Sequence, residues 1–116
     1  PEEMLDDKRI AVIGTPGGSR IITMVFIGLL ELLDGRTPLE AVSAPRMHHQ
    51  YLPDTVSLEP DALSAHDIKT LTAMGHTVSG GERAWGNMQA VAWLKERNVV
   101  LGASDPRWSS GRAVVK

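Results

Sequence analysis

Apolar runs broken by short polar segments divide the chain into predicted strands and helices. Residues 8–14, KRIAVIG, are apolar and rich in β-branched side chains and end at a glycine, which predicts a buried strand. Residues 19–33 predict a helix with Ser19 as its N-cap and Gly35 as its C-terminal stop. This helix is apolar on most of its surface, so we expect it to be covered on more than one side. The residues expected to share one apolar face are Ile22, Val25, Phe26, Leu29 and Leu33.

Shorter elements follow along the rest of the chain. Residues 37–40, TPLE, combine a capping threonine, a proline and a capping-box glutamate, and the helix that they begin ends before Pro45. Ser64 begins a further helix that stops at Gly75, between short strands in VSLEP and HTVS. Residues 88–104 place two apolar strands around the polar connector KERN, which predicts an antiparallel hairpin. The predicted fold class is therefore α+β, with helices packed on a mainly antiparallel sheet.

The composition is that of an ordinary folded domain and excludes several classes of site. Of 116 residues, 42% are hydrophobic and 22% are charged, and the net charge of −2 gives no support to a nucleic-acid partner. The absence of cysteine excludes disulfides and thiolate metal sites. The longest apolar run, 21–33, is too short to span a bilayer, and no signal peptide is visible. We expect one domain, or a single piece of one, over residues 1–116, with 1–8 as a flexible lead-in.

The stretch GTPGGSR, between the first strand and the first helix, carries the main candidate site. A Walker loop would need a lysine that is absent here, and the glycine spacing does not fit a dinucleotide fingerprint. Gly17 and Gly18 have no side chains to shield their N–H groups, and they precede a helix whose N-terminus favours negative charge. They therefore form either an anion or oxyanion cradle or only a tight turn, and the pattern alone favours the turn.

Other residues attract weaker hypotheses. His48 and His49 are adjacent and make a poor metal pair, so we expect hydrogen-bonded structural roles for them. Asp105 and Arg107 flank a proline and form either a substrate-facing ion pair or, more commonly, a salt-bridged turn. Pro1 would be a secondary-amine catalyst only at a free N-terminus, and nothing else supports that role. The tryptophans are too scattered in sequence to predict a stacking platform; they are Trp85, Trp93 and Trp108.

Five fragments taken together resemble one family. They are GTPGGSRIITMV, APRMHHQYLPD, LTAMGHTVS, WGNMQAV and LGASDPR. Their order and approximate spacing are similar to the C-terminal end of the small subunit of γ-glutamyltransferases, also called γ-glutamyltranspeptidases. The resemblance extends from about Ile10 to Arg107. Because the glycine pair leading into SRI and the APRMHHQ block are specific in combination, they change the preferred interpretation of the glycine pair from a turn to a functional site.

The resemblance implies a fold, a reaction and a role for the two glycines. The family belongs to the N-terminal nucleophile hydrolases, with a four-layer αββα core. A threonine at the new N-terminus of the small subunit attacks the γ-glutamyl amide of glutathione or a related donor, and the acyl-enzyme passes to water, an amino acid or a peptide. Gly17 and Gly18 match the pair whose backbone N–H groups form the oxyanion hole. No cofactor and no metal are implied, and relatives are often periplasmic or extracellular, although the chain shows no signal for a compartment.

The resemblance also implies what this chain lacks. The nucleophilic threonine, the serine pair and acidic residue that hold the substrate, and the large-subunit arginine all belong to segments upstream of the matched region. We therefore expect the isolated chain to be inactive, and to self-associate through apolar surface that the rest of the parent enzyme would cover. Two alternatives remain: a non-enzymatic binding or structural module that diverged from this family, and an independent anion-binding domain.

Overall fold

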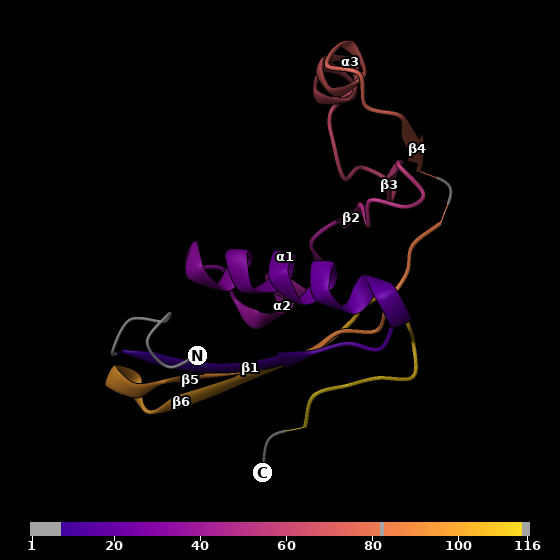
Figure 1. Cartoon of the computed structure of the whole chain (residues 1–116). Helices are drawn as coiled ribbons and strands as arrows, with labels where there is room; N and C mark the ends of the chain where they lie inside the picture. Colours follow the sequence, from indigo (N-terminus) through magenta and orange to yellow (C-terminus); the bar gives the residue numbers. More distant parts are fainter. Residues whose placement is uncertain (1–7, 82, 115–116) are drawn as a thin grey trace.

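The computed structural model describes residues 8–81 and 83–114, so residues 1–7 of the predicted lead-in, with Pro1, lie outside the described residues. Figure 1 shows helices and strands interspersed along the chain. The elements in order are β1 (Arg9–Gly14), the 3-10 turn η2 (Gly18–Arg20), α1 (Ile21–Leu33), α2 (Pro38–Ser43), β2 (Met47–His48), β3 (Val56–Leu58), α3 (Ala65–Ala73), β4 (Val78–Gly80), β5 (Gln89–Leu94), the 3-10 turn η3 (Lys95–Arg97) and β6 (Val99–Ser104).

The first sheet has strand order β1-β5-β6, and both of its strand pairs are antiparallel. The predicted hairpin is confirmed, because β5 and β6 pair from Gln89 opposite Ser104 to Leu94 opposite Val99. Helices α1 and α2 lie together over one face of this sheet (Figure 1). Small residues on that face allow the helices to approach closely. The core formed there consists of Met24, Val42, Met88, Ala90 and Ala103, with Ile13 and Trp85 packed against it.

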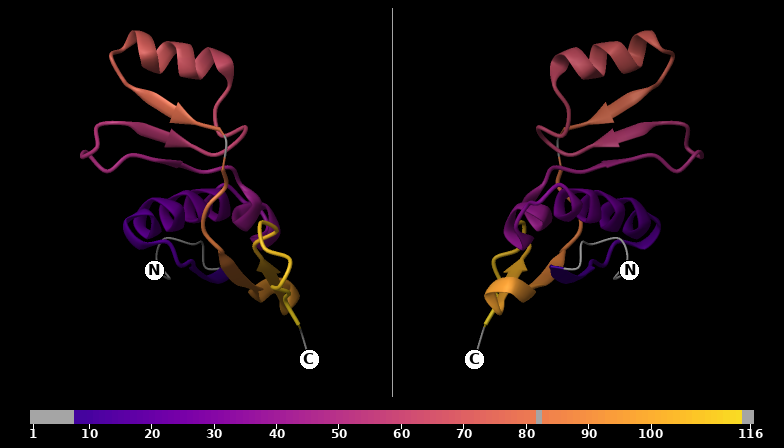
Figure 2. Two further views of the ribbon diagram at one scale, coloured as in Figure 1. Left: turned by 90° about the vertical axis from the view of Figure 1, so that its right-hand side faces the viewer. Right: turned by 90° about the vertical axis from the view of Figure 1, so that its left-hand side faces the viewer.

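The second sheet, β2-β3-β4, projects away from α1 (Figure 2). Strands β2 and β3 are antiparallel, whereas β3 and β4 are parallel and are joined through α3. The Ser64 hydroxyl accepts a hydrogen bond from Asp67 N–H at 3.0 Å, which confirms the predicted N-cap of α3. The predicted capping box of α2 is also present, with reciprocal hydrogen bonds between Thr37 and Glu40.

Helix α1 begins differently from the prediction. Its N-cap is Arg20, which makes no side-chain capping bond, and the Ser19 hydroxyl instead donates to Gln50 Oε1 at 2.9 Å. The reason is that the chain enters the helix through the 3-10 turn at Gly18–Arg20, so Ser19 already lies inside a helical turn. At the other end the predicted stop at Gly35 is confirmed, because its N–H donates to Leu32 O at 3.1 Å.

The buried face of α1 is not the face that the sequence favoured. Met24 and Leu32 are fully buried, and a side chain at Gly28 would collide with Ile13 of β1, so this stripe packs closely on the sheet. The predicted core residues Ile22 and Phe26 remain 81% and 59% exposed. Within the described residues α1 contacts β1, α2 and β2, so it is covered on more than one side, as predicted. The part of its surface that carries Ile22 and Phe26 nevertheless stays exposed.

The outer face of the first sheet is also apolar and exposed. Val12 and Val91 are paired across β1 and β5, and Trp93 and Val100 are paired across β5 and β6. All four side chains are among the exposed large hydrophobic groups of the chain. The sheet therefore has one face packed against helices and an opposite face that exposes large apolar side chains, where Ala113 and Gly111 of the final segment lie against Gly102 and Ser104 of β6. None of the helices in the described residues is both long enough and apolar enough to cross a membrane.

Candidate active site

The glycine pair lies where β1 passes into η2 and α1, and both glycines occupy backbone conformations that side chains disfavour. Gly17 has φ +151° and Gly18 has φ +59°. A side chain at Gly17 would also collide with Met24 Cε, whereas no atom lies within 4 Å of the corresponding point at Gly18. Local geometry thus explains why glycine stands at each position. It also leaves the space beside Gly18 open to another molecule.

The two amides are available as donors. Among residues 8–81 and 83–114, neither the Gly17 N–H nor the Gly18 N–H donates a hydrogen bond. Gly17 is the N-cap of η2 and Gly18 is its first residue, so both amides lie at the N-terminal end of the continuous helical segment formed by η2 and α1, which carries partial positive charge. This arrangement suits the oxygen of an anion or of a tetrahedral intermediate.

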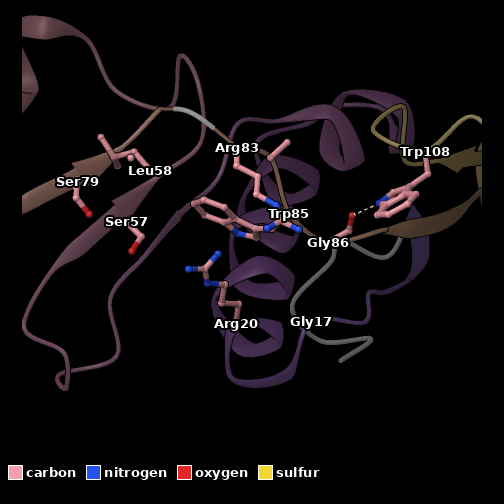
Figure 3. A pocket seen from close by; sticks show the side chains of 11 residues that line it. Gly17, Arg20, Ser57, Leu58, Ser79, Arg83, Trp85, Gly86 and Trp108 are labelled. Carbon is pink, nitrogen blue, oxygen red and sulfur yellow. Dashed lines mark hydrogen bonds between the residues drawn. The ribbon is translucent and has the colours of Figure 1, made fainter.

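A cavity of about 650 Å³ opens beside Gly17. We call it the Trp85 cavity. Figure 3 shows Arg20 and Trp85 on one side of it and Ser57 and Ser79 of the second sheet on the other. The Arg20 guanidinium lies 4.3 Å from the centre of the Trp85 ring, within cation–π distance. The cavity thus combines cationic, aromatic and hydroxyl groups next to the glycine pair.

Two of the three tryptophans share this cavity although they lie far apart in sequence. Trp85 and Trp108 both line it, and the Trp108 indole N–H donates to Gly86 O at 2.7 Å. Trp93 remains apart on β5, where its indole N–H donates to Asn98. The sequence does not predict this arrangement, because Trp85 and Trp108 meet only where the segment after β6 folds back on the loop that follows β4.

Four charged side chains, three of them buried and the fourth, that of Arg107, partly buried, hold the wall of the cavity in place. Arg46 Nη2 lies 2.7 Å from Asp105 Oδ2, and Arg107 lies 2.5 Å from Glu59 Oε2 and 3.1 Å from Asp105 Oδ1. Arg46 also donates to Trp85 O, and Trp85 N–H donates to Glu59 Oε1 at 2.8 Å. We call Arg46, Glu59, Asp105 and Arg107 the buried charge network. Because its members form hydrogen bonds with both the carbonyl and the N–H of Trp85, the network fixes this residue relative to the sheets.

The network confirms the salt-bridged turn at Asp105 and Arg107 and adds two members that the sequence did not reveal. Burial by itself raises the pKa of Asp105, but hydrogen bonds from Met88 N–H, Arg107 and Arg46 outweigh it and hold that pKa below its usual value. Burial likewise lowers the pKa of Arg107, and its carboxylate partners raise that pKa above its usual value. Both groups are therefore charged at neutral pH. Arg46 and Glu59 lie far from Asp105 in sequence, so only the fold unites them.

The adjacent histidines are hydrogen-bonded structural residues, as predicted. His48 Nδ1 lies 2.8 Å from Thr23 Oγ1 on α1, and His48 Nε2 lies 2.9 Å from Gln50 Oε1. His49 Nε2 lies 2.9 Å from Asp54 Oδ1. The described part of the chain contains no group of three or more histidine, aspartate or glutamate side chains that could hold a metal ion. His48 thus ties β2 to α1 near the glycine pair.

Comparison with known proteins identifies the family. The family model described as gamma-glutamyltranspeptidase matches residues 2–115. The chain belongs to the gamma-glutamyltranspeptidase family. It is 41% identical over 114 residues to a glutathione hydrolase proenzyme of Pseudomonas aeruginosa, covering 96% of this chain and 20% of that protein. It is 42% identical to the Escherichia coli glutathione hydrolase proenzyme, covering 88% of this chain and 17% of that protein.

Solved structures agree with this assignment. A Helicobacter pylori gamma-glutamyltranspeptidase matches with a TM-score of 0.78 and 39% identity, covering 84% of this chain and 54% of that chain. The family and the α+β fold class predicted from the sequence are therefore confirmed. The chain spans about a fifth of the length of its curated gamma-glutamyltranspeptidase relatives, in agreement with a C-terminal part of such an enzyme. The oxyanion role of Gly17 and Gly18 stays a prediction.

Proposed function

We propose that this chain is the C-terminal portion of an enzyme that transfers or hydrolyses the γ-glutamyl group of glutathione and related compounds. Its contribution to the reaction is the oxyanion hole, formed by the N–H groups of Gly17 and Gly18. The observation that carries the proposal is a pair of unused amides at a helix N-terminus beside the Trp85 cavity, in a chain of the gamma-glutamyltranspeptidase family. The relatives' name, glutathione hydrolase, supports glutathione as the donor.

The reaction places a specific demand on this geometry. A threonine at a subunit N-terminus, supplied by another part of the longer protein, attacks the γ-glutamyl carbonyl, and the carbonyl oxygen acquires negative charge. Donors fixed at the position of that oxygen stabilise the transition state by about 3 kcal/mol each, because they need no reorganisation. The amine leaves with a proton, and water, an amino acid or a peptide then takes the acyl group from the threonine. Gly17 and Gly18 act at both tetrahedral intermediates.

Cleavage of a γ-glutamyl anilide tests the proposal. The longer protein that carries this chain is expected to release the aniline after it matures, and the isolated chain is expected to release none because it has no nucleophile. The release is measured by absorbance with both proteins at equal concentration. A longer protein that matures correctly and shows no turnover would contradict the proposal and favour a binding or structural module that diverged from the family.

Self-association of the isolated chain is a separate prediction. The outward faces of α1 and of the first sheet carry large exposed hydrophobic side chains, including Ile22, Phe26 and Val12. Apolar surface of this kind associates in water. We expect light scattering coupled to size exclusion to show oligomers whose mass rises with concentration, and Phe26→Asp to reduce that mass. A monomer at all concentrations would contradict this prediction.

The compartment of the longer protein is also a proposal. The family resemblance favours a periplasmic or extracellular location, and fractionation of source cells followed by the anilide assay tests it. Activity confined to the cytoplasmic fraction would contradict it.

A further inference from the structure

Two arginines without carboxylate partners line the Trp85 cavity. Within the described ranges, neither Arg20 nor Arg83 forms an ion pair, whereas Arg46 and Arg107 are both paired with buried carboxylates. None of the described residues that line the cavity is acidic. The cavity therefore offers positive charge that the described parts of the chain do not neutralise.

The other groups in the cavity suit the same kind of ligand. Arg20 is half-buried and lies against the Trp85 ring, which restricts its guanidinium to one side of the cavity. Ser57 and Ser79 lie opposite, on β3 and β4, and their hydroxyls are potential donors (Figure 3). Guanidinium and hydroxyl donors together match a carboxylate, and guanidinium in particular binds carboxylates through paired hydrogen bonds.

The position of the cavity relative to the glycine pair indicates which carboxylate it would receive. Gly17 lines the cavity and also supplies one of the proposed oxyanion donors. The leaving group is attached to the same carbon as the oxyanion, so it starts beside Gly17. In glutathione the leaving group is cysteinylglycine, and an extended segment of two residues reaches at most about 7 Å. A dipeptide of this length fits within a cavity of about 650 Å³.

We propose that the Trp85 cavity is the subsite for the leaving-group side of the donor, and that Arg20 and Arg83 bind the carboxylate at its end. This inference rests on the proposed function of the same site. It assigns to these arginines a role in selecting donors whose leaving group ends in a carboxylate, such as a γ-glutamyl peptide. The Trp85 ring contributes an apolar wall for the side chain next to that carboxylate.

The test compares two donors that differ by one carboxylate, γ-glutamyl-4-nitroanilide and γ-glutamyl-3-carboxy-4-nitroanilide, in the longer protein. Arg83 is exposed, so Arg83→Gln removes its charge with little risk to folding. We expect Arg83→Gln to lower the ratio of kcat/KM for the carboxylated donor to kcat/KM for the neutral donor about tenfold, because one charge-assisted contact is lost. Arg97→Gln is the matched control, since Arg97 is an exposed arginine on η3 outside this cavity, and it should leave the ratio unchanged.

An unchanged ratio in Arg83→Gln would overturn the inference. So would an equal loss on both donors, since this would place the arginine near the γ-glutamyl part. If the unmodified longer protein cleaves neither donor, the proposed function fails, and calorimetry with cysteinylglycine still tests the cavity. Binding that Arg83→Gln weakens about tenfold supports the carboxylate site, and binding that is absent or unaffected by Arg83→Gln overturns it.

Discussion

Replacing Gly18 by glycolic acid, which converts its amide into an ester, is expected to lower kcat on γ-glutamyl donors about 100-fold in the longer protein. The change removes only the N–H donor, and loss of one oxyanion donor has an effect on the order of 100-fold to 1000-fold. Proline would also remove the N–H, but its φ near −65° does not fit the +59° that Gly18 adopts. The ester therefore separates loss of the donor from distortion of the turn. Single-turnover kinetics on a γ-glutamyl anilide measures the effect.

The matched control places the same ester at Gly35. The Gly35 N–H donates to Leu32 O at the C-terminal end of α1, far along the helix from the glycine pair. Losing this hydrogen bond is expected to lower stability by about 1 kcal/mol and to leave kcat unchanged. If the ester at Gly18 has no larger effect on kcat than the ester at Gly35, the oxyanion assignment is wrong and the glycine pair acts only as a turn.

Asp105→Ala is expected to destabilise the protein by about 3–5 kcal/mol, because it removes a carboxylate partner from the buried guanidinium of Arg46 and from the partly buried guanidinium of Arg107. The Asp105 side chain has no exposed surface and receives hydrogen bonds from Arg46, from Arg107 and from Met88 N–H. The free energy of unfolding is measured by tryptophan fluorescence in urea, a signal to which Trp85, held by this network, contributes together with Trp93 and Trp108. Asp54→Ala is the control, because Asp54 pairs with His49 at the surface and is 84% exposed. Surface pairs of this kind contribute about 0–1 kcal/mol.

The pH dependence of this effect follows from the lowered pKa of Asp105. A carboxylate whose pKa is lower in the folded state stabilises the fold fully above its unfolded value, which is near 3.8, and loses that contribution as the pH falls through the folded value. The stability difference between the unmodified protein and Asp105→Ala should therefore be largest at neutral pH and should narrow below about pH 3.8. A difference no larger than that of Asp54→Ala at pH 7 would show that the network does not stabilise the fold.

The sequence correctly predicted the features that depend on contacts between residues close together in the chain. The capping box at Thr37 and Glu40, the cap at Ser64 and the stop at Gly35 are contacts between residues a few positions apart, and all are confirmed. The hairpin of β5 and β6 is likewise local, since its connector spans only four residues. The cap predicted at Ser19 is wrong because Ser19 lies inside the 3-10 turn that leads into α1, and its hydroxyl donates to the distant Gln50.

The candidate site was likewise predicted from the sequence only where it depends on neighbouring residues. The glycine pair was visible in the sequence because backbone chemistry at a strand-to-helix turn depends on neighbouring residues and because the surrounding motif resembles a known family. The Trp85 cavity was not visible, because Ser57 of β3, Trp85 of the loop after β4 and Trp108 of the segment after β6 are brought together only by the fold. The sequence predicted two members of the buried charge network, Asp105 and Arg107, because they flank a single proline in a short turn.

The sequence by itself determined the element types, most helix boundaries, the family and the position of the glycine pair. Tertiary structure decided which apolar face of α1 is buried, which charges meet in the interior and which side chains surround the cavity. The physical reason is that periodicity and capping depend on spacing along the chain, whereas burial and ion pairing depend on which distant surfaces meet. Helix α1 shows this directly: both of its faces are apolar, and the close approach of Ile13 to Gly28 shows which one packs on the sheet.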